Sequence, residues 1–228
     1  MRQYPITLSV VRPNWSANPS AHRVTGPVGE EAHQKIFKRD DHTCQCCGFR
    51  AEKYQEILHI NGDARDWRDD NVLTVCLFCA QCFDLMKTGQ ARAGMLVWLP
   101  EISQPVFHHL MRALYVARVA GGGLAEAARD AYDRLMARGE EAKKRLGSSD
   151  PEALAIVLRD FLNVKQYADV QERLGGIRLM PLDRRMVKDG DLEYNQFPQI
   201  LAYWRSKRGP FGELPAQEWA SKFKDLAI

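Results

Sequence analysis

The chain has 228 residues, of which 45% are hydrophobic, 27% charged and 9% aromatic, the composition of a soluble globular protein with a sizeable core. Its formal net charge of +3 is too small to indicate a nucleic-acid or membrane partner by itself. The sequence contains no run of about 18 apolar residues, and the apolar stretch near its start is too short for a secretory signal. We therefore expect a cytosolic protein that reaches a membrane only through a partner.

The first part of the chain is expected to contain a short edge strand, a loop and a helix, followed by a cysteine-rich stretch and a second short strand. Weak alternation over residues 5–11 predicts an edge strand, and residues 12–27 are rich in Pro, Asn, Ser and Gly, as loops are. An apolar stripe predicts a helix over residues 28–39. The cysteine-rich stretch covers roughly residues 40–90, and MLVWLP, residues 95–100, predicts a short strand.

The second half is expected to be mainly helical. Apolar residues at helical spacing predict helices over residues 103–119 and 124–146, with three glycines between them. A third helix is expected to start near Asp150 and Pro151 and to run to about Asn163. The shorter elements expected after it are a helix over 166–174, an extended piece over 177–182 and two tail helices, near 197–206 and 214–226.

All six cysteines lie between Cys44 and Cys82, whereas a disulfide-stapled fold would spread them more widely. Cys44-x-x-Cys47 and Cys76-x-x-Cys79 each predict a tight turn that directs two sulfurs to one point. Four thiolates suit the tetrahedral coordination of zinc, and four protein ligands leave no position for water. The sequence therefore predicts one structural zinc ion held by these four cysteines.

Three other readings of the cysteines stay open. The first is a redox-active C-x-x-C pair, and the second is a set of buried free thiols. The third is a shifted register, because Cys79 and Cys82 have the same spacing as the other pairs. In the preferred register, Cys46 and Cys82 are expected to be small buried side chains.

Residues 55–79, QEILHINGDARDWRDDNVLTVCLFC, resemble the HNH, or ββα-metal, endonuclease module. In that family an R-D-x-x-x-C pattern precedes the first C-x-x-C turn, as Arg39, Asp40 and Cys44 do here. The resemblance puts His59 at the position of the general base, and Asn71 at the Asn that precedes the second turn.

Two positions depart from the HNH pattern. Leu58 stands where the first metal ligand is expected, and Ala80 stands where the final metal-binding His is expected. Since neither side chain can bind a metal, the resemblance implies a scaffold that has lost its catalytic ion, and we predict no enzyme activity. His59 is then expected to be a hydrogen-bonded structural residue. Four nearby acidic residues are expected to form a solvated polar loop: Asp63, Asp66, Asp69 and Asp70.

The charge of this module also argues against nucleic acid as a partner. Residues 34–90 contain eight Lys or Arg and nine Asp or Glu, a balance of −1 (8 − 9), whereas a DNA-binding module should be basic. The helix expected over residues 77–86, LFCAQCFDLM, is apolar and belongs in a core or against another protein. A nuclease that uses His59 and a non-catalytic nucleic-acid-binding zinc module remain the alternatives.

These expectations combine into an α+β fold in which a small HNH-like zinc module, two short strands plus a helix, packs with a mainly helical C-terminal part. The predicted segments are an N-terminal strand and loop (1–27), the zinc module (28–100), a helical region (101–184) and an irregular tail with short helices (185–228).

Longer stretches of the sequence resemble the IcmJ, also called DotN, proteins of type IVB secretion systems. The stretches are QKIFKRDDHTCQCCGFRAEKYQEILHINGD, NVLTVCLFCAQCF, MLVWLPEISQ, SSDPEALAIVLRDF and ERLGGIRLMPL. The similarity covers roughly residues 34–185, and it leaves out the first 30 residues and the tail that contains YNQFPQILAYWRSKRGPFGELPAQEW.

This resemblance implies a function that the spacing of residues does not reveal. It implies a non-catalytic adaptor of the type IV coupling complex, which binds the C-terminal extension of the DotL-like coupling ATPase and helps to recruit substrates for export. Other subunits of the complex are expected partners, whereas nucleic acid and direct membrane insertion are not expected. The implied location is cytoplasmic, peripheral to the inner membrane through that complex.

Overall fold

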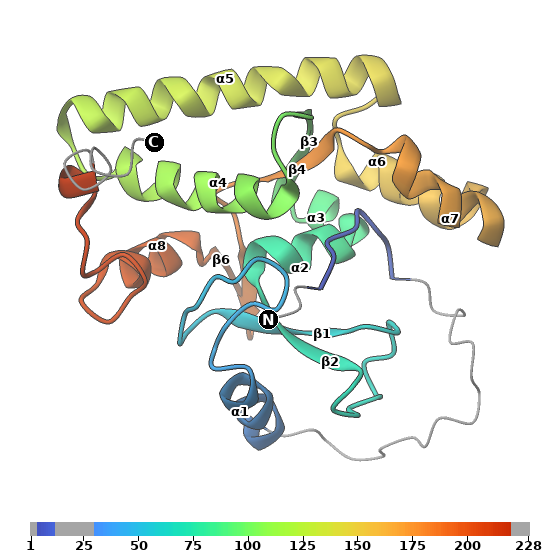
Figure 1. The fold of residues 1–228 in the computed structure, drawn as a ribbon, viewed down its shortest axis with the longest axis horizontal. Coiled ribbons are helices and arrows are strands. Elements are labelled where there is room, and N and C mark those ends of the chain that lie inside the picture. Colours follow the sequence, from blue (N-terminus) through green and yellow to red (C-terminus); the bar gives the residue numbers. More distant parts are fainter. Residues whose placement is uncertain (1–3, 12–29, 220–228) are drawn as a thin grey trace. The chain divides into compact units, whose positions relative to one another are not determined.

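The computed structural model describes residues 4–11 and 30–219, and Figure 1 shows its elements. The fold is mixed α+β, as predicted, with helices and short antiparallel strand pairs. The chain forms two compact units: Met1–Thr88 with Pro151–Gly175, and Gly89–Asp150 with Gly176–Ile228. The segment boundaries predicted after residues 27, 100 and 184 stay a prediction. The predicted loop at 12–27 lies outside the described residues, as does most of the helix predicted at 214–226.

The first unit is built around a short hairpin. Helix α1 (Glu30–Arg39) precedes β1 (Gln55–His59), which pairs antiparallel with β2 (Val72–Cys76) in the register Gln55↔Cys76. Helix α2 (Leu77–Phe83) follows β2 directly, and its Leu77, Phe78, Cys79, Gln81 and Cys82 are buried. The apolar sequence of α2 is therefore explained by the core.

The edge strand predicted over residues 5–11 is wrong. The described residues 4–11 are irregular, and Ser9 binds the ends of two helices instead of a strand. Its N–H donates to the carbonyl oxygen of Cys82 (2.9 Å), and its carbonyl accepts from the N–H of Leu85 (3.0 Å), which begins α3 (Leu85–Gln90). Since these partners lie at helix termini, no strand ladder can form.

The segment that returns to this unit, residues 151–175, contains two α-helices, in agreement with the helices predicted from Asp150 to about Asn163 and over residues 166–174. Helix α6 (Pro151–Ile156) continues as a π-helical turn, η1 (Val157–Phe161), and α7 (Val164–Arg173) follows. Asn163 separates them because it caps α7: its side chain accepts from the N–H of Gln166, and the Gln166 side chain accepts from the N–H of Asn163.

The second unit contains a strand pair and two long helices. β3 (Gly94–Trp98) pairs antiparallel with β4 (Ile177–Pro181), the extended piece that the sequence predicted. Helices α4 (Gln104–Arg118) and α5 (Gly122–Leu146) pack on each other and on these strands. The side chain of Gln104 fixes the start of α4, because its Nε2 donates to the carbonyl of Leu179 (2.7 Å) and its Oε1 accepts from the N–H of that residue (2.9 Å).

Trp98 organises one end of the second unit. The guanidinium of Arg145, in the last turn of α5, lies 3.9 Å from the centre of the Trp98 ring. Gly176, the residue just before β4, has φ = 86°, and a Cβ atom added to it would lie 2.5 Å from the Trp98 ring. Only glycine combines this backbone conformation with so close an approach.

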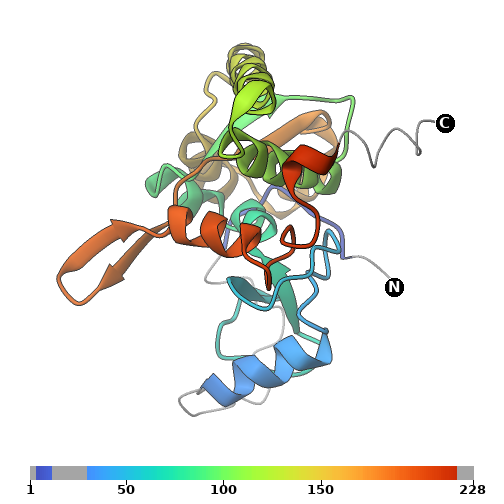
Figure 2. The ribbon, with the colours of Figure 1, turned by 90° about the vertical axis from the view of Figure 1, so that its left-hand side faces the viewer.

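The tail is more ordered than the sequence predicted. β5 (Met186–Asp189) and β6 (Leu192–Asn195) form a hairpin that was not predicted, followed by α8 (Phe197–Arg205) and η2 (Ala216–Glu218). Figure 2 shows the hairpin extending away from α8. An aromatic contact ties α8 to α4, since Phe197 lies edge-on to Tyr115 (4.9 Å), and within α8 the same ring lies edge-on to Trp204 (5.9 Å).

Candidate metal centre

Four buried cysteines come together in the first unit. The Sγ atoms of Cys44, Cys47, Cys76 and Cys79 all lie within 4.8 Å of one another. These four are the cysteines that the sequence singled out, and the geometry is compatible with a structural metal. Cys82 lies outside this group.

Backbone hydrogen bonds shape the first C-x-x-C turn. The N–H of Cys44 donates to the carbonyl of Phe49 (2.9 Å), and the N–H of Gly48 donates to the carbonyl of Cys44 (2.9 Å). Gly48 has φ = 76°, a conformation that glycine adopts without strain. The N–H of Gln45 donates to the carbonyl of Thr74 (2.8 Å), so this turn is fastened to β2, the strand that ends at Cys76.

The second pair of cysteines spans the junction of a strand and a helix. Cys76 is the last residue of β2, and Cys79 lies in the first turn of α2. Because β2 leads directly into α2, both sulfurs face the first turn, and the Sγ atoms of Cys47 and Cys76 are 3.7 Å apart.

An ion pair fastens α1 to the outer edge of β2. The Nε of Arg39 donates to Oδ1 of Asp40 (2.8 Å), and Oδ2 of Asp40 accepts from the N–H of Thr74 (2.9 Å). The Nη2 of Arg39 also donates to the carbonyl of Val72 (2.7 Å). Arg39 and Asp40, the Arg-Asp pair of the HNH-like pattern, thus bind backbone groups of β2 that do not pair with β1. These bonds fix the position of β2, the strand that ends at Cys76, against the end of α1.

The donor set fits a zinc ion. Four Zn–S bonds of about 2.3 Å in a tetrahedron require sulfurs about 3.8 Å apart, close to the distance between Cys47 and Cys76. Sulfur-only coordination also matches the metal's preference for thiolate. All four cysteines are buried, so the site has no exposed face for a substrate.

The thiols of this cluster influence one another. Hydrogen bonding between their sulfurs raises the pKa of Cys44 to about 12, with Cys46 as the main partner. The contact with Cys44, and to a smaller extent a contact with Cys79, lowers the pKa of Cys46 to about 5. Cys46 therefore lies against the cluster, which the spacing did not predict. Burial raises the pKa of Cys82, whose Sγ donates to the carbonyl of Phe78 (3.7 Å), so Cys82 is a neutral core thiol as expected.

His59 differs from its predicted role as a hydrogen-bonded residue. Its Nε2 is buried and has no hydrogen-bond partner in the described part of the chain. The ring is held instead by Trp67, which lies edge-on at 4.9 Å. Burial lowers the pKa of His59 despite the nearby charges of Asp66 and Asp63, so the imidazole is neutral near pH 7.

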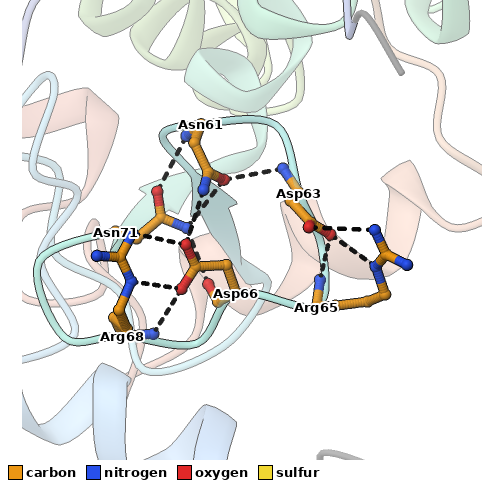
Figure 3. Close-up of polar contacts among 6 residues, drawn as sticks. All are labelled: Asn61, Asp63, Arg65, Asp66, Arg68 and Asn71. Atoms are coloured by element: carbon orange, nitrogen blue, oxygen red, sulfur yellow. Dashed lines mark hydrogen bonds and ion pairs between the residues drawn. The ribbon is translucent and has the colours of Figure 1, made fainter. Parts of the chain in front are cut away.

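The acidic loop between β1 and β2 is ordered by its own hydrogen bonds, and Figure 3 shows Asn61, Asp66 and Asn71 turned toward one another. The Nδ2 of Asn61 donates to Oδ2 of Asp66 (2.8 Å), and Nδ2 of Asn71 donates to Oδ1 of Asn61 (3.0 Å). The guanidinium of Arg68 binds both carboxylate oxygens of Asp66 and lowers its pKa to about 2.

Two further carboxylates of this loop are also paired. Asp63 binds Arg65 (2.9 Å), and Asp69 lies 3.6 Å from Lys35. Asp66 is only 5% exposed, so it is not on the solvated face that the sequence predicted, whereas Asp69 is. Within residues 4–11 and 30–219, the four cysteines are the only group of three or more His, Cys, Asp or Glu ligands close enough to hold an ion.

Comparison with known proteins agrees with the resemblance found in the sequence. No family model matches the chain. Among the described residues, no helix is both long and apolar enough to span a bilayer. The Type 4 apparatus protein DotN of Legionella pneumophila subsp. pneumophila is 35% identical over 153 residues, which make up 65% of this chain and 71% of DotN. Because this identity extends over most of both proteins, the chain belongs to the DotN (IcmJ) family.

Proposed function

We propose that this protein is a non-catalytic, zinc-stabilised adaptor of a type IVB secretion coupling complex. It binds the C-terminal extension of the coupling ATPase, peripheral to the inner membrane, and helps to recruit substrates for export. The observation that carries this proposal is the 35% identity to a type 4 apparatus protein.

Zinc is the metal that we propose for the site, with Cys44, Cys47, Cys76 and Cys79 as its ligands. Four thiolates within 4.8 Å of one another leave no coordination position for a substrate or a reactive water. The ion would therefore stabilise the fold. It would connect the turn before β1 to the junction of β2 and α2.

A non-catalytic role also agrees with the side chains around His59. Leu58 and Ala80 offer no metal-binding atom at the positions where the HNH pattern needs one. The nearby carboxylates of Asp63 and Asp66 are held in bidentate ion pairs by Arg65 and Arg68. An added cation would have to displace both guanidinium groups.

The direct test is a titration of the full-length chain, loaded with zinc, with the purified C-terminal extension of the cognate coupling ATPase. We expect binding at micromolar concentration or tighter, measured by isothermal titration calorimetry. The variant Cys44→Ser should lose binding because the metal centre fails, and His59→Ala should keep it. Absence of binding by the wild-type chain at micromolar concentration contradicts the proposal.

The nuclease alternative is tested by incubating the chain with plasmid DNA and magnesium or manganese. We expect no cleavage. Cleavage that disappears in His59→Ala shows that the chain is an enzyme and overturns the proposal that it is non-catalytic.

A further inference from the structure

The sequence contains one Asn-Gly dipeptide, Asn61–Gly62, at the start of the loop between β1 and β2. In such a dipeptide the backbone nitrogen of the second residue can attack the side-chain amide carbon of the first, and glycine has no Cβ to obstruct the attack. Asn61 and Gly62 are both exposed, so water reaches any intermediate that forms there. The chain therefore meets the chemical requirements for deamidation at Asn61.

Hydrogen bonds hold the side-chain amide of Asn61 at its oxygen and at its nitrogen, as Figure 3 shows. The Nδ2 atom donates to Oδ2 of Asp66 (2.8 Å), and Oδ1 accepts from the N–H of Asp63 (2.9 Å) and from Nδ2 of Asn71 (3.0 Å). The bond to Asp66 is charge-assisted, because the guanidinium of Arg68 binds both oxygens of that carboxylate and keeps it ionised. The amide therefore cannot rotate without breaking these bonds.

The attacking atom is held as well. The N–H of Gly62 donates to the carbonyl of His59 (3.0 Å). Attack requires this nitrogen to give up its proton and to meet Cγ of Asn61 in a suitable orientation, and both steps break hydrogen bonds of the loop. The folded loop therefore opposes the reaction that its sequence permits.

We propose that Asn61 is a latent deamidation site, which the folded loop protects and which reacts once the loop opens. The Gly62 nitrogen then forms a bond to Cγ of Asn61, and the bond from Cγ to Nδ2 breaks. The amide group leaves as ammonia with the proton of the Gly62 nitrogen, and a cyclic imide remains. Water then opens the imide at either carbonyl, which gives aspartate or isoaspartate at position 61.

The products cannot rebuild the network of the loop. Each carries a carboxylate in place of the amide donor of Asn61, and isoaspartate also lengthens the backbone. In the intact loop that donor lies 2.8 Å from Oδ2 of Asp66, so the new carboxylate meets a like charge. Deamidation therefore makes an opening of the loop permanent, and it requires neither the metal nor a partner.

Two alanine variants of the full-length chain test the inference. Asp66→Ala removes the carboxylate that binds Nδ2 of Asn61. The matched control Asp63→Ala removes a carboxylate that binds the guanidinium of Arg65 in the same bidentate way, but it retains the backbone N–H that binds Asn61. After incubation at neutral pH, peptide mass spectrometry measures conversion at position 61, and labelling by an isoaspartyl methyltransferase measures isoaspartate.

Asp66→Ala should deamidate about tenfold faster than wild type, as the loss of one charge-assisted hydrogen bond implies, and Asp63→Ala should stay within about twofold of wild type by the same estimate. Wild type unfolded in guanidinium chloride gives the rate of the open chain, and the folded chain should react at least about tenfold more slowly. Circular dichroism shows whether each variant is folded. If Asp66→Ala unfolds, Asp66→Asn takes its place, because it keeps an acceptor oxygen but loses the charge; it should also react faster than wild type.

Three results would contradict the inference. The first is an equal rate in the folded and the unfolded wild-type chain. The second is a folded Asp66 variant that reacts no faster than wild type. The third is an acceleration in Asp63→Ala as large as that in Asp66→Ala.

Discussion

Substitution of Cys79 by serine, compared with Cys82→Ala, separates a metal ligand from a core thiol. Both side chains are fully buried and lie one helical turn apart in α2. We expect Cys79→Ser to lose the bound zinc and to unfold the first unit. Cys82→Ala should keep one zinc ion per chain.

The magnitudes follow from what each sulfur contacts. Structural zinc contributes about 10–16 kcal/mol of apparent free energy at neutral pH, which exceeds the net stability of about 5–15 kcal/mol of a typical domain. Cys79 belongs to the four-sulfur group, so replacing it removes most of that contribution. Cys82 lies outside the four-sulfur group and its Sγ donates to the carbonyl of Phe78, so its truncation should cost about 1–2 kcal/mol.

The assay measures zinc per chain by inductively coupled plasma mass spectrometry, together with thermal unfolding followed by far-ultraviolet circular dichroism. Wild type treated with a strong chelator should melt like Cys79→Ser. The reasoning fails if Cys79→Ser retains one zinc ion and wild-type melting, or if Cys82→Ala loses the metal. The second result would favour the shifted register in which Cys79 and Cys82 form the pair.

Three further predictions concern stability. Asp40→Ala should destabilise the chain by about 3 kcal/mol in urea unfolding, because Arg39 and the N–H of Thr74 lose a buried partner. The control Asp41→Asn, which suits the left-handed backbone of that residue, should cost clearly less, since that carboxylate is 70% exposed; equal effects would contradict the role given to Asp40. Burial alone would raise the pKa of Asp40, but hydrogen bonds from its partners lower it overall. The stability that ionised Asp40 contributes is therefore fully present above the pKa of an aspartate in the unfolded chain, about 3.9. It is lost as pH falls through the lower pKa of Asp40 in the folded chain. Urea midpoints from pH 6 to pH 3 should fall less steeply in Asp40→Asn, and equal slopes would refute this. Gly176→Ala should cost more than about 2 kcal/mol, because the added Cβ would overlap the ring of Trp98. Gly190 also has a positive φ but lies in open space, so Gly190→Ala should cost about 1 kcal/mol. Thermal melting of both variants measures the difference.

The four-cysteine group could be identified from the sequence almost completely. Spacing identified Cys44, Cys47, Cys76 and Cys79, because two short C-x-x-C turns can present four sulfurs only if they meet. The long helices were also predictable, since apolar periodicity over 15 residues in α4 and 25 in α5 outweighs local exceptions. The family likewise followed from sequence runs alone.

Other features depended on contacts between residues far apart in the chain. Residues 5–11 alternate like a strand, yet Ser9 is bound by helix ends, and no local pattern contains that information. The β5–β6 hairpin was missed because each strand has only four residues and its turn begins with a single glycine. The placement of Cys46 against the four-sulfur group depends on the turn that α1 and β2 hold in place.

By itself, the sequence determined the chemistry of the chain: four thiols at metal-binding spacing, and no metal-binding side chain at two positions where an HNH nuclease needs one. The tertiary structure decided how the remaining polar groups are used. Asp40 binds a backbone amide of β2, and Asp66 is neutralised by Arg68, pairings that spacing alone cannot distinguish from solvent exposure. The reason is physical, because a carboxylate's role depends on which donors the fold brings within about 3 Å of it.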